Sequence, residues 1–408
     1  MIGTLIVGSL ISMSHVDAAY VSPEETERMI EAAQKINEGN RLFEAGNYTQ
    51  AIELYNEAIE LNPNEANYYY NRGCAYDDVG QYQLAMADFN KAISLDNTNA
   101  DMYNNRGLVH EHLRQLDRAV ADYDQAIRLN AKHSSAYNNR ANAYAGLGDY
   151  KKALADYDKA IKLKPDYANA WNNRGNVYAS LKQYDKALAN YTQAIELNPK
   201  DSSAYYNRAN AYDDLKDYRR AIADYDKAIE LAPTYASAYN NRGNSYADLK
   251  DYRQAIANFD KAIELAPDYA GAYNNRGNAY YNLKDYQRAI ADFDKAIEYD
   301  PQSAAAYNNR GNAYDDLKQY ERAIEDFDKA IELLPTYASA YNNRGISYGN
   351  LRQYERAIED FTRAIELNPK YILAYNNRGA CYQVLGEAAK AQADFDKANS
   401  LRARSGVA

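Results

Sequence analysis

The sequence predicts an all-α protein built from tandem pairs of helices, and three observations lead to this prediction. Seven prolines, from Pro165 to Pro369, follow one another at intervals of 34 residues. The segment Ala-Tyr-Asn-Asn-Arg-Gly-Asn-Ala-Tyr occurs unchanged at residues 272–280 and 306–314. Within each period, apolar residues recur at helical spacing in two separate sets. Self-similarity at such a period is typical of a stacked solenoid rather than of several globular domains.

The repeats divide the chain into four parts. Counted from Ala32, eleven units of 34 residues fill residues 32–405. Residues 1–18 form an apolar segment that resembles a signal peptide, and residues 19–31 begin an N-terminal capping helix. Residues 406–408 form a short tail. Below, a position number is the place of a residue within its 34-residue unit.

The unit at residues 270–303 shows why each period is a pair of helices. Its first apolar set ends at position 14, and its second begins at position 17. The link Leu-Lys-Asp at 283–285 breaks the phase between them, and Pro301 ends the second helix. One pair cannot cover its own apolar faces, so neighbouring units must stack. At the N-terminal end, Ser22 followed by Pro23 and Glu25 predicts a capped helix start.

The N-terminal segment bears on location. Its 13 apolar residues are too few to span a bilayer. Val16 and Ala18 fit a signal-peptidase site, whereas the basic stretch that usually precedes the apolar run is absent. We expect a secreted or periplasmic protein if residues 1–18 are a signal peptide, and a cytoplasmic protein otherwise.

Composition excludes several function classes. A net charge of −10 argues against nucleic acid as a partner, because that interaction needs a clustered basic surface. Two cysteines, Cys74 and Cys381, provide no disulfide framework. The four histidines lack metal-ligand spacing, and no phosphate loop or nucleophile motif occurs. We therefore expect no enzyme activity, no catalytic residue, no metal and no cofactor.

The unit resembles the tetratricopeptide repeat at its most characteristic positions. The resemblance rests on residues at positions 4, 8, 11, 20, 24, 27 and 32, which are Tyr273, Gly277, Tyr280, Ala289, Phe293, Ala296 and Pro301. It covers all eleven units, most loosely the first, third and last. It implies antiparallel helix pairs stacked into a right-handed superhelical solenoid, with the first helices lining a concave groove that binds peptides or proteins.

Arginine at position 7 lies within the apolar stripe of the first helix in ten units. A buried guanidinium without a partner is costly. Position 23 is Asp in eight of these units and Asn190 or Asn258 in the other two, whereas the first unit lacks both the arginine and the acid. This co-occurrence predicts a ladder of Arg–Asp pairs, either within a unit or between neighbouring units.

Asparagines form a column on the face of the first helix opposite the core. This first-helix face comprises positions 2, 5, 6, 9, 12 and 13. We expect its amides to bind an extended peptide, because an amide both donates and accepts hydrogen bonds. The column resembles the asparagine ladder of the O-GlcNAc transferases, and the alternative is a solvated residue copied by duplication. The candidate residues at positions 6 and 9 are Asn37, Asn71, Asn105, Asn139, Asn173, Asn207, Asn241, Asn275, Asn309, Asn343, Asn377, Asn40, Asn142, Asn176, Asn210, Asn244, Asn278 and Asn312.

The first-helix face is also acidic. No Lys or Arg occurs at its six positions in any unit, which predicts a neutral or basic partner and argues against the acidic C-termini of chaperones. Its carboxylates at positions 12 and 13 are Glu44, Asp77, Asp78, Glu111, Asp213, Asp214, Asp248, Asp315 and Asp316.

Two functions follow from these patterns. The first is a non-enzymatic adaptor that binds extended protein segments in the asparagine-lined, acidic groove. The second is an assembly scaffold, for instance in cell-envelope machinery, that binds through its convex face or its ends. Polar substitutions in the last unit, including Asn399 at position 28, indicate a terminal helix that faces water. Because no separate capping helix follows it, we expect this end either to stay partly exposed or to self-associate with another copy of the chain.

Overall fold

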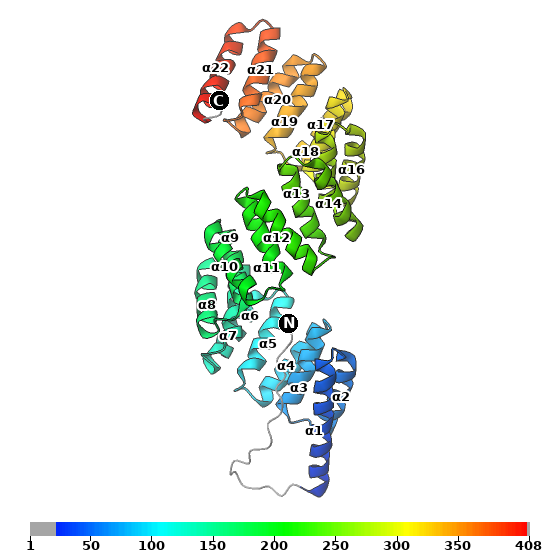
Figure 1. Cartoon of the computed structure of the whole chain (residues 1–408), viewed down its shortest axis with the longest axis vertical. Coiled ribbons are helices and arrows are strands. Elements are labelled where there is room, and N and C mark those ends of the chain that lie inside the picture. The colour runs from blue at the N-terminus through cyan, green and yellow to red at the C-terminus, as the bar shows by residue number, and fades with distance from the viewer. Residues whose placement is uncertain (1–21, 406–408) are drawn as a thin grey trace. The chain divides into compact units, whose positions relative to one another are not determined.

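The computed structural model describes residues 22–405, and every regular element in that part of the chain is an α-helix (Figure 1). The predicted all-α fold class is confirmed by 22 helices arranged in tandem pairs, with no strand among the described residues. The predicted signal-peptide-like segment and the tail at 406–408 lie outside the described residues. The first helix begins at Pro23, within the range 19–31 that was expected to start a capping helix.

The chain forms two compact units that divide after Pro199. In the N-terminal unit, consecutive helices pack against each other in chain order. Its helices are α1 (Pro23–Glu44), α2 (Tyr48–Leu61), α3 (Ala66–Asp78), α4 (Tyr82–Leu95), α5 (Ala100–His112), α6 (Leu116–Leu129), α7 (Ser134–Gly146), α8 (Tyr150–Leu163), α9 (Ala168–Ser180) and α10 (Tyr184–Leu197).

The C-terminal compact unit repeats the same arrangement. Its helices are α11 (Ser202–Asp214), α12 (Tyr218–Leu231), α13 (Ala236–Asp248), α14 (Tyr252–Leu265), α15 (Ala270–Asn282), α16 (Tyr286–Tyr299), α17 (Ala304–Asp316), α18 (Tyr320–Leu333), α19 (Ala338–Asn350), α20 (Tyr354–Leu367), α21 (Ile372–Val384) and α22 (Ala388–Ser405).

A left-handed residue at position 15 makes the turn between the two helices of each pair. Its φ angle lies between 57° and 79° in all eleven units. Four units have glycine there, and seven have lysine or arginine, for which a left-handed conformation costs ~1–2 kcal/mol. The residues are Gly46, Gly80, Arg114, Gly148, Lys182, Lys216, Lys250, Lys284, Lys318, Arg352 and Gly386.

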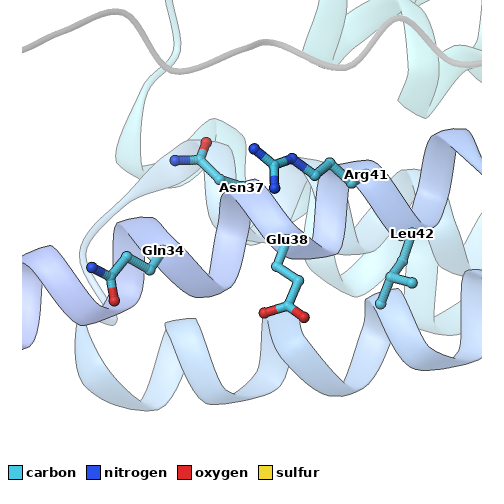
Figure 2. A pocket seen from close by; sticks show the side chains of 5 residues that line it. All are labelled: Gln34, Asn37, Glu38, Arg41 and Leu42. Carbon is cyan, nitrogen blue, oxygen red and sulfur yellow. The ribbon is translucent and has the colours of Figure 1, made fainter.

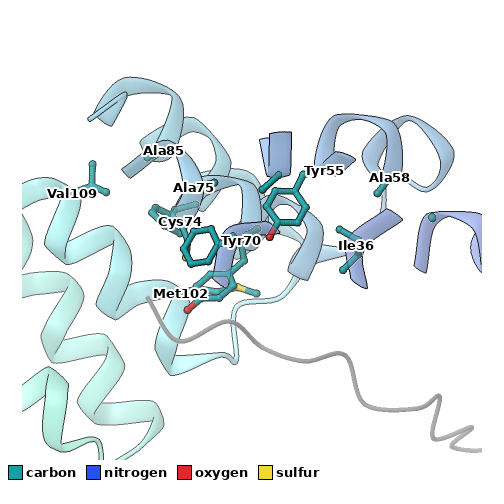
Figure 3. Close-up of a cluster of buried hydrophobic side chains, with 14 residues drawn as sticks. Ile36, Tyr55, Ala58, Tyr70, Cys74, Ala75, Ala85, Met102 and Val109 are labelled. Atoms are coloured by element: carbon teal, nitrogen blue, oxygen red, sulfur yellow. The ribbon is translucent and has the colours of Figure 1, made fainter. Parts of the chain in front are cut away.

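The core of each unit is an aromatic ring at position 24 packed against a small residue at position 8. A Cβ added to Gly243 would lie 2.6 Å from a ring carbon of Phe259, so the close approach of the two helices requires this small residue. Figure 3 shows the corresponding core at the N-terminal end, where Tyr55, Tyr70 and Met102 are fully buried. The aromatic ring thus sets the distance between the helices of a pair.

The two ends differ from the interior. Ser22 accepts from the backbone N–H of Glu25, whose carboxylate accepts from the backbone N–H of Ser22, so the predicted capping box is confirmed. At the other end, Asn399 is exposed on α22, while Leu373 and Val384 expose more than half of their surface. Self-association through this end stays a prediction.

No helix in the described part of the chain is long and apolar enough to cross a bilayer.

Candidate functional site

Arginine at position 7 bridges two consecutive units. Arg276 donates from Nε and Nη2 to the two carboxylate oxygens of Asp292, at 2.8 and 2.6 Å. Its Nη1 donates to Oδ1 of Asp260, at position 25 of the preceding unit, at 2.6 Å. Its guanidinium also lies 5.5 Å from the ring centre of Tyr273. The arginine therefore pairs within its own unit and with the preceding unit at once.

The predicted Arg–Asp ladder is confirmed in eight units. The two-oxygen pairs are Arg72–Asp88, Arg106–Asp122, Arg140–Asp156, Arg208–Asp224, Arg276–Asp292, Arg310–Asp326, Arg344–Asp360 and Arg378–Asp394. In the other two units, Arg174 and Arg242 donate from Nε to the amide oxygens of Asn190 and Asn258. Sequence reasoning missed the partner at position 25, although Asp or Asn recurs there in most units.

Asparagine at position 6 does not point away from packed side chains, and that expectation is wrong. Asn71 and Asn139 are buried, Asn37 is exposed, and the other eight are half-buried. The side chain faces the first helix of the preceding unit, where its amide finds partners. Asn37 differs because no unit precedes it. A helical wheel does not reveal this contact, because it shows only which side of a helix packs on the second helix of the same unit, not which side packs on the neighbouring unit.

The amide at position 6 is used in hydrogen bonds between units. Asn343 donates from Nδ2 to Asn308 at 3.2 Å and to Asn312 at 2.9 Å, and its Oδ1 accepts from Asn342 at 3.2 Å. The same donation to an asparagine at position 5 of the preceding unit is made by Asn139, Asn173, Asn275, Asn309 and Asn377. Where position 5 is a tyrosine, Asn105 and Asn241 donate to the hydroxyls of Tyr70 and Tyr206. These bonds offset the poor helix propensity of asparagine.

Asparagine at position 9 falls into two groups. Asn40, Asn142, Asn176 and Asn210 each accept from the hydroxyl of a tyrosine at position 24 of the same unit. Asn244, Asn278 and Asn312 lie in units where position 24 is phenylalanine. Asn312 accepts from Asn343, whereas the side-chain amides of Asn244 and Asn278 make no hydrogen bond with any described residue.

The predicted carboxylates also differ in their surroundings. Asp213 accepts from the hydroxyls of Tyr225 and Ser245, at 2.9 and 2.7 Å, and burial raises its pKa. Asp315 accepts from Ser347 at 2.5 Å, and burial likewise raises its pKa. Asp214, Asp248 and Asp316, at position 13, are exposed, and Asp316 accepts from Tyr281 at 2.6 Å.

Asp77, at position 12 of the second unit, has no such donor. The residue that corresponds to Ser245 is Val109, and Oδ1 of Asp77 is buried without a hydrogen-bond partner among the described residues. Nε2 of His112 lies 3.8 Å from that oxygen, and the His112 ring stacks on Tyr82. Burial raises the pKa of Asp77 to about 6.

Four predicted residues line one hollow between α13 and α15. They are Asn244, Asp248, Asn275 and Asn278, and the hollow has a volume of about 350 Å³. Ala247, Tyr252, Phe259, Ala279 and Asn282 complete its lining. The hollow brings the two unbonded amides and an exposed carboxylate together on the first-helix face, beside aromatic surface.

A second hollow lies on α1. Gln34, Asn37, Glu38, Arg41 and Leu42 line a volume of about 530 Å³ (Figure 2). Arg41 follows Asn37 by one helical turn on the same side of the helix, as Figure 2 shows. Asn37 thus has a cation beside it, at position 10, which lies outside the six positions of the first-helix face.

Cys74 and His133, whose residue types often act in catalysis, have structural surroundings here. Burial raises the pKa of the Cys74 thiol to about 12, which keeps it protonated and unreactive at neutral pH. His133 caps α7 through the backbone N–H of Ala136 and bonds to Asp101 at 3.1 Å. Within residues 22–405 no group of three His, Cys, Asp or Glu side chains is placed to hold a metal ion.

Comparison with known families identifies the repeat. Nine consecutive segments match the family model described as Tetratricopeptide repeat, at residues 66–99, 100–133, 134–167, 168–201, 202–235, 236–269, 270–303, 304–337 and 338–371. A model described as TPR repeat matches residues 39–80, and another Tetratricopeptide repeat model matches residues 361–393. Together the nine segments cover about three quarters of the chain.

Curated relatives match over short stretches. Mitochondrial import receptor subunit TOM70 of Homo sapiens is 48% identical over 46 residues, which are 10% of this chain and 8% of the relative. Small glutamine-rich tetratricopeptide repeat-containing protein alpha of Rattus norvegicus is 42% identical over 55 residues, which are 14% of this chain and 18% of the relative. The matches thus span less than a fifth of these relatives.

Solved structures that resemble this chain are also repeat proteins. YrrB, described as a TPR protein with an unusual peptide-binding site, is 29% identical with a TM-score of 0.38, over 45% of this chain and 95% of its own. MamA is 27% identical with a TM-score of 0.37, over 40% of this chain and 95% of its own. The APC/C hetero-tetramer Cut9–Hcn1 is 15% identical with a TM-score of 0.49, over 88% of this chain and 98% of its own.

Proposed function

Because the chain belongs to the tetratricopeptide repeat family, we propose that it is a non-enzymatic adaptor that binds extended segments of other proteins on its first-helix face. The observation that carries the proposal is the hollow between α13 and α15. It presents the unbonded amides of Asn244 and Asn278 together with the exposed carboxylate of Asp248. A peptide main chain needs both donors and acceptors, and an unbonded amide offers both.

In this proposal the ligand contacts positions 9, 12 and 13 rather than position 6. At position 6 the amide already joins neighbouring units, as in Asn343, so a ligand would have to compete with these bonds. At position 13, Asp214 and Asp248 are exposed and make no hydrogen bond with any described residue. In this proposal the asparagines at position 6 therefore stabilise the packing between units, and the residues at positions 9, 12 and 13 contact the ligand.

The charge of this surface favours a neutral or basic segment. No Lys or Arg stands at the six positions of the first-helix face, and exposed carboxylates recur there. Complementary charge mainly raises the association rate and rejects like-charged partners. An adaptor of this kind loses affinity as salt concentration rises, since exposed charges are screened over about 10 Å at 0.1 M ionic strength.

The test uses a defined peptide. A random peptide library is selected on the wild-type chain, and the tightest binder is synthesised with both ends capped, at about 12 residues and so about 40 Å when extended. Its affinity is then measured by calorimetry for two charge-reversed variants. One carries Asp214→Lys and Asp248→Lys on the first-helix face. The matched control carries Glu230→Lys and Glu264→Lys, which are exposed on the second helices and change the net charge equally.

The two variants separate the adaptor from the scaffold. The adaptor predicts that the aspartate variant loses at least tenfold in affinity for a basic peptide, while the glutamate variant changes little. Loss in the glutamate variant alone would place binding on the outer helices, as the scaffold alternative has it, and would overturn the proposal. Failure to select any peptide would also overturn it.

A further inference from the structure

The residue at position 24 determines whether the asparagine at position 9 has an unoccupied oxygen. Position 24 is tyrosine in the four units that contain Asn40, Asn142, Asn176 and Asn210. It is phenylalanine in the three that contain Asn244, Asn278 and Asn312. The two side chains share the same buried ring position and differ by one hydroxyl group.

In three of the four tyrosine units, those of Asn40, Asn142 and Asn210, the amide oxygen already accepts two hydrogen bonds. Oδ1 of Asn142 accepts from the Tyr157 hydroxyl at 2.6 Å and from Nδ2 of Asn173 at 3.1 Å. Oδ1 of Asn210 accepts from the Tyr225 hydroxyl at 2.6 Å and from Nδ2 of Asn241 at 3.0 Å. An amide oxygen has two lone pairs, so none remains for a ligand.

In the phenylalanine units the amide is available. The side chains of Asn244 and Asn278 form no hydrogen bond with any described residue, and both line the hollow between α13 and α15. The amides at position 6 of the following units, Asn275 and Asn309, donate only to position 5, at 3.1 Å in both cases. Asn312 keeps one lone pair, because it accepts only from Asn343.

We infer that phenylalanine at position 24, combined with an asparagine at position 9 whose amide makes no other hydrogen bond, marks the units that bind the ligand, so that Asn244 and Asn278 bind the main chain of the extended segment and the tyrosine units do not. Each free amide donates to a peptide C=O and accepts from a peptide N–H. Consecutive first helices lie about 8–10 Å apart, which corresponds to about three residues of extended peptide. The inference rests on the proposed function and restricts it to residues 236–303.

Exchange of a single hydroxyl group tests this inference. Phe259→Tyr with Phe293→Tyr occupies the oxygens of Asn244 and Asn278, as Tyr225 does for Asn210. The matched control is Tyr157→Phe with Tyr191→Phe, which frees Asn142 and Asn176 from their tyrosines. The chain carries both residues at position 24, so each exchange introduces a ring that the fold already accommodates. The ligand is the selected peptide described above.

We expect the Phe→Tyr variant to lose about 10-fold or more in affinity, because two amides lose their acceptor function and each hydrogen bond is worth about 2- to 10-fold. The Tyr→Phe control is expected to bind equally well or more tightly. Methylation of the peptide nitrogens, one at a time, should weaken binding to the wild type at two sites about three residues apart. The effect of N-methylation is expected only if Asn244 and Asn278 contact the main chain of the peptide.

Three outcomes would overturn the inference. One is unchanged affinity in the Phe→Tyr variant, and another is an equal loss in the Tyr→Phe control. If the Phe→Tyr variant does not fold, Asn244→Ala with Asn278→Ala replaces it, and unchanged affinity there is the third. In each case a persistent loss in the Asp214/Asp248 variant would keep the proposed function, whereas no loss in that variant would reject both.

Discussion

Replacement of Arg310 by leucine tests the arginine ladder at a carboxylate that is almost completely buried. Arg310 donates to both oxygens of Asp326, at 2.9 and 2.6 Å, and only 7% of the Asp326 side chain is exposed. Burial raises the pKa of Asp326, and the guanidinium partly offsets that effect. The variant leaves a buried carboxylate without a cation, which costs about 3–5 kcal/mol. The lost contact to exposed Asp294 adds at most about 1 kcal/mol.

Arg242→Leu is the matched control, because its partner within the unit, Asn258, is neutral, while its contact to exposed Asp226 matches that of Arg310 to Asp294. Its expected cost is about 1–1.5 kcal/mol, from the lost hydrogen bonds alone. The assay is hydrogen–deuterium exchange of the helix pair that holds each arginine, since units of a repeat array open locally. The difference of about 1.5–4 kcal/mol corresponds to exchange that is accelerated roughly 10- to 1,000-fold more in α17 and α18 of Arg310→Leu than in α13 and α14 of Arg242→Leu.

The stability that Arg310→Leu loses depends on pH, and the sign of this dependence follows from the raised pKa of Asp326. A carboxyl whose folded pKa is raised destabilises the fold when ionised, so the penalty is complete above the folded pKa. It disappears as pH falls toward the unfolded value near 3.9. The loss in free energy of unfolding caused by Arg310→Leu should therefore become smaller on acidification. The double variant Arg310→Leu with Asp326→Leu should recover most of that free energy at neutral pH. Equal costs for Arg310→Leu and Arg242→Leu would refute the reasoning.

Two further predictions concern stability. Asp77→Asn should stabilise the fold at pH 7.5, by about 2–3 kcal/mol for a pKa of about 6. The gain should fade as the pH falls from about 6 toward 4, because Asp77 is protonated first in the folded state and then, near pH 3.9, in the unfolded state as well. A full gain that persists in urea titrations at pH 4 would contradict this. Lys250→Gly should raise the free energy of unfolding by about 1 kcal/mol, because Lys250 has a φ of 64°, a left-handed conformation that glycine adopts without steric cost. Gly148→Lys is its converse control, and a loss of thermal stability in Lys250→Gly would contradict the assignment of strain to the turn.

The repeat architecture and the arginine ladder could be predicted because each depends on a pattern within one unit. The 34-residue period places Pro301 and Tyr273 without any knowledge of the neighbours. The pairing of Arg276 with Asp292 could be inferred because positions 7 and 23 vary together. The first unit lacks both the arginine and the acid, and the two other units without the aspartate carry an asparagine in its place. Its second partner, Asp260, lies in the preceding unit, and the pattern within one unit gives no sign of it.

The role of the asparagines could not be predicted in the same way. A helical wheel places Asn343 opposite the core of its own pair, but that side faces Asn308 and Asn312 of the preceding unit. Only the stacking of units decides whether such a face meets solvent or another amide. The alternation of tyrosine and phenylalanine at position 24 is visible in the sequence, and its meaning requires the 2.6 Å contact between Tyr157 and Asn142.

The most direct test of the account is to locate the bound peptide by photo-crosslinking. The selected peptide carries a benzophenone at its centre and is irradiated with the full chain, and the joined fragments are identified by mass spectrometry. The account predicts crosslinks within residues 240–248 and 274–282, on α13 and α15, which are suppressed by Phe259→Tyr with Phe293→Tyr. Crosslinks on α16 or on the terminal helices α1 and α22 would contradict it, because the ligand would then bind away from the hollow between α13 and α15.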